Sequence, residues 1–73
     1  MKYKVIHGDD EPLYIEGFGA AQEVLLTAVK ELESRGALPH WRAIALVNQV
    51  DNMPRAGFSF ATDDGVLVGV EKA

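Results

Sequence analysis

The stretch that decides the fold is GAAQEVLLTAVKELESR, residues 19–35. Apolar side chains recur in it at intervals of three and four residues, the spacing of one face of an α-helix. The residues of this stripe are Ala21, Val24, Leu25, Ala28 and Leu32. Gly36 follows at the position where a left-handed glycine ends many helices. We therefore predict an amphipathic helix over this stretch, with its apolar stripe buried against a sheet.

The residues before this helix predict a β-hairpin. Residues 2–7 and 13–17 are short segments in which β-type side chains alternate between two faces. The residues between them, 8–12, read GDDEP, a run of turn formers that closes with a proline. Tyr3 and Ile15 are then expected on the same face of the sheet, toward the core.

A second hairpin is predicted after the helix, from residues 57–62 and 66–71 around the sequence DDG at 63–65. A three-residue loop would place the phenylalanines of the first strand opposite valines of the second and give one apolar face. A two-residue loop would instead place Phe60 opposite Gly69. We therefore predict the three-residue loop.

Residues 41–50 fit two structures. Trp41, Ile44, Val47 and Val50 are β-formers and favour a strand. The alternative is a helix in which Ala43, Leu46, Val47 and Val50 form a stripe, with Pro39 near its start. We favour the strand, which gives the order ββαβββ, whereas the helix would give ββααββ. In both cases we expect a single α+β domain over residues 1–73, a small antiparallel sheet with one main helix packed on one face.

Composition limits the possible classes of function. The chain has 73 residues, no cysteine, and 11 acidic against 7 basic residues, a net charge of −4. An acidic chain is poorly suited to bind phosphate backbones, so we expect no direct contact with nucleic acid. The first residues are too polar to open a signal peptide, and no apolar run is long enough to span a membrane. Because the chain lacks cysteine, we expect a soluble protein of the reducing cytoplasm.

Reactive side chains are sparse. His7 stands near the acids of residues 9–11, but three consecutive acids in a short turn do not form a calcium loop, and a solvated turn is the better interpretation. Ser34 and Ser59 have no base placed beside them by the sequence. We therefore expect no catalytic residue, no metal site and no cofactor, and we predict that the protein is not an enzyme.

The sequence Gly17-Phe18-Gly19 joins a predicted strand to the predicted helix. Exposed N–H groups at such a helix start can bind anions. The segment lacks the further glycine or lysine of the known phosphate-binding loops. We favour a tight turn in which Phe18 packs into the core.

A surface for a partner is expected on the sheet, because one helix covers only one of its faces. Ile6, Tyr14, Leu67 and either Trp41 or Ile44 would point outward on the uncovered face. His40 and Arg42 flank Trp41 and could add a ring and a guanidinium to the contact. The residues predicted to bind a partner are Tyr14, His40, Trp41, Arg42 and Leu67.

Three functions follow from these features. The first is a small acidic regulatory or accessory module that occupies the surface of a partner protein. That partner would be basic, as in phage-type inhibitors of nucleic-acid machinery. The second is a structural homo-oligomer, a dimer through the sheet face or an edge strand. The third is a small domain that binds an anionic ligand at the turn from Gly17 to Gly19. We favour the first.

Overall fold

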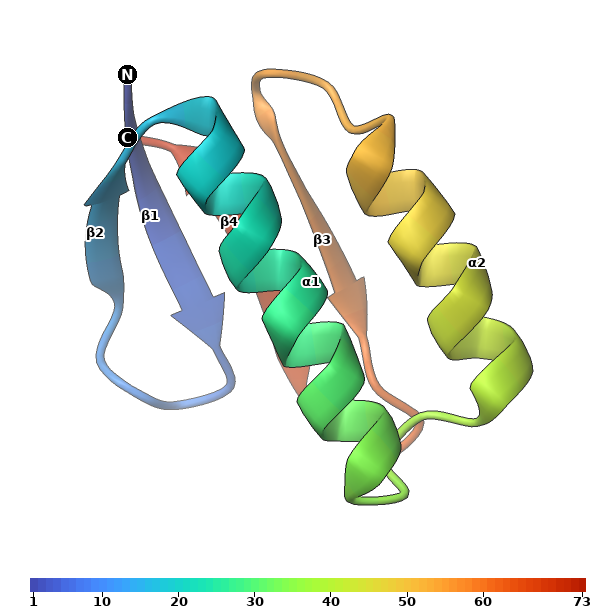
Figure 1. Ribbon diagram of the computed structural model, residues 1–73. Coiled ribbons are helices and arrows are strands. Elements are labelled where there is room, and N and C mark those ends of the chain that lie inside the picture. Colours follow the sequence, from blue (N-terminus) through green and yellow to red (C-terminus); the bar gives the residue numbers. More distant parts are fainter.

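The computed structural model describes residues 1–73 and has two layers, a four-stranded antiparallel sheet and two helices on one face of it (Figure 1). The elements are β1 (Lys2–His7), β2 (Leu13–Glu16), α1 (Phe18–Ser34), α2 (His40–Asp51), β3 (Gly57–Ala61) and β4 (Leu67–Lys72). The predicted α+β class and the antiparallel sheet are confirmed. Neither helix combines the length and the apolar character that a bilayer-spanning segment requires.

The favoured order ββαβββ is wrong, and the alternative ββααββ is observed, because residues 41–50 lie in α2. Ala43, Leu46 and Val50 form the buried stripe of this helix and pack in the common core. Its start is set by Pro39, which is extended and precedes the first helical residue. Tertiary burial of this stripe outweighs the β-propensity of the larger side chains.

The sheet has the order β2-β1-β4-β3, so the first and the last strands of the chain pair in its centre. Both predicted hairpins are present. The three-residue loop at 63–65 is confirmed, because Phe60 lies opposite Val68 and the backbone N–H of Thr62 donates to the carbonyl of Val66 at 2.9 Å. Gly65, with φ of 87°, supplies the left-handed residue of that loop.

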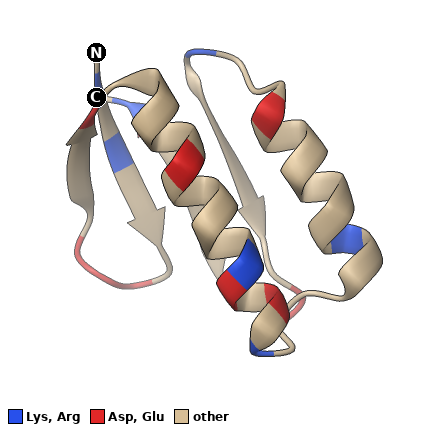
Figure 2. Cartoon of the chain, viewed as in Figure 1, with Lys and Arg blue, Asp and Glu red and all other residues tan.

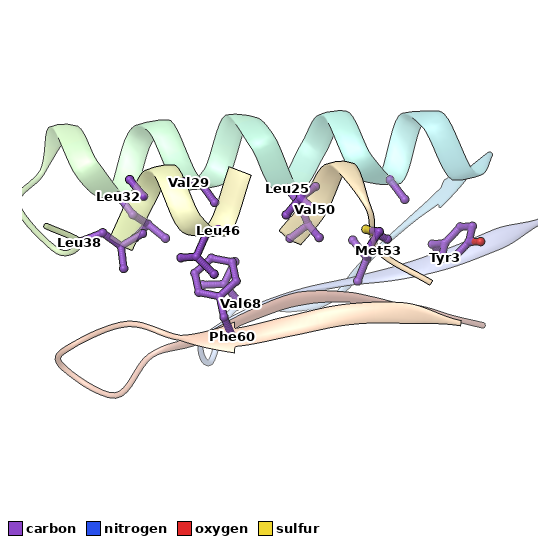
Figure 3. Packing of buried hydrophobic residues seen from close by; sticks show 13 residues of the cluster. Tyr3, Leu25, Val29, Leu32, Leu38, Leu46, Val50, Met53, Phe60 and Val68 are labelled. Carbon is purple, nitrogen blue, oxygen red and sulfur yellow. The ribbon is translucent and has the colours of Figure 1, made fainter. Parts of the chain in front are cut away.

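The core lies between the helical layer and the sheet (Figure 3). From α1 it takes Ala21, Leu25, Val29 and Leu32. Val29 was not in the predicted stripe, which followed one narrow face of the helix. Val24 and Ala28 of the predicted stripe are half-buried, and the buried face is turned toward Val29 because α1 contacts α2 as well as the sheet.

A polar contact also joins the two helices. The side-chain amide of Gln22 on α1 donates to the carbonyl of Val50 at 3.1 Å, near the end of α2. The carbonyl of Val50 also accepts from the backbone N–H of Met53 at 3.2 Å, so the Gln22 amide is its second donor. The contact fixes α2 against the first half of α1.

Candidate protein-interaction surface

The residues predicted to bind a partner lie on two opposite faces of the molecule. Tyr14 on β2 and Leu67 on β4 are on the uncovered face of the sheet and are 58% and 47% exposed. His40, Trp41 and Arg42 form the start of α2, in the helical layer. The expectation that Trp41 or Ile44 would extend the sheet face is therefore wrong, because both residues belong to α2.

The uncovered sheet face does not present a continuous apolar patch. Tyr14 lies opposite Lys4, whose Nζ is 3.8 Å from Oε1 of Glu71 on the neighbouring strand. The next row across the sheet holds the half-buried Ile6 and then Gly69, which has no side chain. Isolated exposed apolar residues of this kind are normal on protein surfaces. This face is mixed and largely polar.

The exposed face of α2 is different. Trp41 is 72% exposed and Ile44 is 51% exposed, and their three-residue spacing places them on neighbouring turns of one helix face. We call the surface formed by these two residues the Trp41 face.

A groove runs beside the Trp41 face, between α1 and α2. Its volume is about 210 Å³. Apolar side chains from both helices line it together with a basic and an acidic residue, namely Val29, Ala43, Ile44, Val47, Lys30 and Glu33. We call it the α1–α2 groove. Because Ile44 belongs to both features, an object seated in the groove would also touch the Trp41 face.

His40 fastens the start of α2 to the end of α1. Its Nδ1 lies 2.6 Å from Oε2 of Glu33, one of the residues that line the groove. The imidazole is 76% exposed, so the contact is a surface pair and contributes little to stability. Its main effect is to hold the carboxylate of Glu33 at the end of the groove nearest Trp41.

Arg42 turns away from the Trp41 face toward the sheet. Its Nη1 lies 2.8 Å from Oδ1 of Asp63, and its other terminal nitrogen donates to the carbonyl of Ala61. The side chain is 26% exposed. Its donors are engaged within the chain, so we assign Arg42 a structural role and leave it out of the proposed contact surface.

The two hairpin turns form an acidic end of the molecule. His7 Nδ1 lies 3.5 Å from Oδ2 of Asp10, and both side chains are exposed. Two open cavities, of about 430 and 600 Å³, share His7 and Val66 in their walls. No group of three or more side chains at this end or elsewhere is arranged to hold a metal ion.

The turn at Gly17 has the conformation of a tight strand-to-helix connection, with φ of 102° at this residue. Phe18 packs against the core, with its ring centroid 6.1 Å from that of Tyr3, as the favoured interpretation expects. The guanidinium of Arg55 lies 4.9 Å from the centre of the Phe18 ring. Binding of an anion at this turn stays a prediction.

The carboxyl group with a clearly shifted pKa is that of Glu16, which does not line the groove. The terminal amine of Met1 is 2.6 Å from Oε2 of Glu16. The hydrogen bond from this amine, and then its charge, lower the pKa of Glu16.

The groove itself was missed by sequence reasoning. The signal was present, because Trp41, Ile44 and Asn48 follow helical spacing on the side of α2 opposite its buried stripe. It could be used only after residues 41–50 were assigned to a helix.

Comparisons of the chain with protein families, curated proteins and solved structures found no match.

Proposed function

We propose that this protein is a non-enzymatic binding module that occupies the surface of a partner protein through the Trp41 face. The observation that carries the proposal is the joint exposure of Trp41 and Ile44 beside the α1–α2 groove. Tryptophan is among the residues that contribute most to binding at protein interfaces. An exposed aromatic anchor next to a small apolar groove has the composition of an interface core.

The role fits a regulatory or accessory protein of the cytoplasm. The described domain has a single core, and we expect its effect to come from covering a partner. A chain without cysteine is typical of a reducing compartment.

Capture of partners by matched variants tests the proposal. The tagged protein and a Trp41→Ala, Ile44→Ala variant are each incubated with a nuclease-treated lysate of the native cell. We expect the wild type to retain a stoichiometric partner and the variant to lose it. Tyr14→Ala, Leu67→Ala is the control, because it removes two apolar residues of comparable exposure from the opposite face.

Circular dichroism establishes that both variants are folded. Equal capture by the Trp41→Ala, Ile44→Ala variant and the wild type would contradict the proposal, and loss of capture only in the control would move the contact to the sheet face.

A further inference from the structure

The size of the α1–α2 groove suits one side chain of a partner. Its volume of about 210 Å³ lies below the roughly 300–1,000 Å³ of sites that enclose small molecules. Its walls are apolar along Val29, Ala43 and Val47, and its charged residues lie on α1. The groove can therefore hold one apolar side chain of a partner. Charged residues around the groove would then select which partner binds.

Charge is distributed unevenly along the molecule. We call one end of the molecule the turn end; it comprises both hairpin turns, the second half of α1 and the first half of α2 (Figure 2). Arg42 of α2 contacts Asp63 of the β3–β4 turn there. Seven of the 11 acidic residues and three of the 7 basic residues lie there, so this end carries all of the net charge of −4. The acidic residues are Asp9, Asp10, Glu11, Glu31, Glu33, Asp63 and Asp64.

Two of the three basic residues of the turn end form ion pairs within the chain. Arg42 is bound by Asp63, and Arg35 lies 3.9 Å from Glu31. Lys30 has no ion-pair partner within 4.0 Å, and it lines the groove with Glu33. Trp41 lies at this same end, in the first turn of α2. The β1–β2 turn lies at the edge of the sheet away from α2, so its acids do not surround Trp41 (Figure 1). The remaining parts of the turn end hold four acidic and three basic residues, so the surroundings of the Trp41 face carry a net charge of −1.

These charges discriminate between classes of partner. The anionic leaflet of a membrane attracts basic segments and repels this surface. Nucleic acid is disfavoured in the same way, because its affinity comes from neutralised phosphates. A second copy of the chain would bring two negative ends together. A protein with a positive surface has the complementary charge.

Resting on the proposed function, we infer that the Trp41 face binds a basic protein segment. One apolar side chain of that segment enters the α1–α2 groove, and lysine or arginine side chains beside it face Glu33 and the acids of the β3–β4 turn. Removing the charge of Glu33 should weaken this contact, and removing the charge of Lys30 should strengthen it.

Trp41 allows a direct test, because it is the only tryptophan of the chain. The probe is a synthetic helical peptide of leucine and lysine without aromatic residues, and its control has glutamate in place of lysine. We expect the lysine peptide to shift the emission of Trp41 to shorter wavelength and the glutamate peptide to leave it unchanged. Binding should weaken as the salt concentration rises.

Charge variants sharpen the result. Glu33→Gln should weaken binding of the lysine peptide about threefold, the size expected for one exposed charge pair, and Lys30→Gln should strengthen it by a similar factor. Glu71→Gln, on the sheet face, should leave the affinity unchanged. Equal binding of both peptides, no shift with either peptide, or no effect of Glu33→Gln and Lys30→Gln would each overturn the inference.

Other occupants give distinct outcomes that also overturn it. A shift of Trp41 emission with phosphatidylcholine vesicles would indicate a lipid surface, and a shift with protein concentration alone would indicate a second copy. The inference and the proposed function fail separately. If lysate capture depends on Trp41 while the peptide test fails, the binding module stands and its partner is not basic.

Discussion

The guanidinium of Arg42 lies 2.8 Å from the carboxylate of Asp63, and this contact ties the first turn of α2 to the turn between β3 and β4. The same side chain donates to the carbonyl of Ala61 at the end of β3. Arg42 is therefore the residue through which α2 makes polar side-chain contact with the sheet. Together with the contacts of Gln22 and His40 and the buried stripe of α2, it holds the Trp41 face in place relative to the sheet.

Arg42→Ala should lower the free energy of unfolding by about 1–2 kcal/mol, because it removes charge-assisted hydrogen bonds from a partly buried side chain. Urea unfolding followed by circular dichroism measures the change. Arg35→Ala is the control, since Arg35 makes only an exposed contact of 3.9 Å with Glu31. We expect a loss of less than about 0.5 kcal/mol there. Equal losses in the two variants would contradict the role given to Arg42.

Tyr3→Phe should destabilise the protein by about 1–2 kcal/mol. The Tyr3 side chain is 0% exposed, and its hydroxyl donates to the carbonyl of Arg55 at 2.7 Å. The phenylalanine variant would leave that carbonyl without its donor. Tyr14→Phe removes a hydroxyl that is exposed on the sheet face and should leave the urea midpoint unchanged. A midpoint of the Tyr3 variant equal to that of the wild type would contradict this role for the hydroxyl.

Gly69→Ala should cost about 3 kcal/mol, at the upper end of the range for overpacking. A Cβ at this position would lie 2.5 Å from the Cβ of Ser59 and 2.7 Å from the carbonyl oxygen of Phe58. Gly19→Ala should have the opposite sign and stabilise by about 0.4–1 kcal/mol, because it lies in α1 with no atom within 4 Å of an added Cβ. Thermal unfolding of both variants, read as shifts in Tm, tests this pair of signs.

The contact between Glu16 and the amine of Met1 should make stability depend on pH. Because the pKa of Glu16 is lowered in the folded state, the stabilisation is complete above 4.5, its ordinary value, and is lost as the pH falls below it. The difference in urea midpoint between the wild type and Glu16→Gln should therefore shrink as the pH falls. Glu11→Gln, which removes no ion pair, should keep the wild-type profile. A Glu16 titration by NMR with a midpoint at or above 4.5 would contradict the prediction.

Turn chemistry explains why both hairpins could be predicted from the sequence. The glycine at position 65 and the alternation of apolar residues on either side fix the register of β3 and β4 locally. The state of residues 41–50 is different, because the same side chains satisfy a strand and a helix. The choice depends on burial of Ala43, Leu46 and Val50 in the shared core, which a local sequence window does not contain.

The candidate site was predictable only in part for the same reason. Trp41 was singled out by its size and its charged neighbours, and it is exposed. The α1–α2 groove needs two helices side by side, and the favoured order ββαβββ has only one. For Arg42 the sequence suggested a contact with a partner. In the structure its guanidinium donates instead to Asp63 and to the carbonyl of Ala61.

The pairing of β1 with β4 has a consequence for biosynthesis. Tyr3 lies opposite Lys72, so the centre of the sheet cannot close until nearly the whole described chain has left the ribosome. In the interval β1 can pair with β2 and be covered by α1, which it contacts in the finished molecule, but its other edge stays open. Such distant pairings slow folding, because the entropy of a long loop is lost before its contacts form. We expect this domain to complete its fold only after β4 has left the ribosome, with an interval in which a chaperone could bind the open edge of β1.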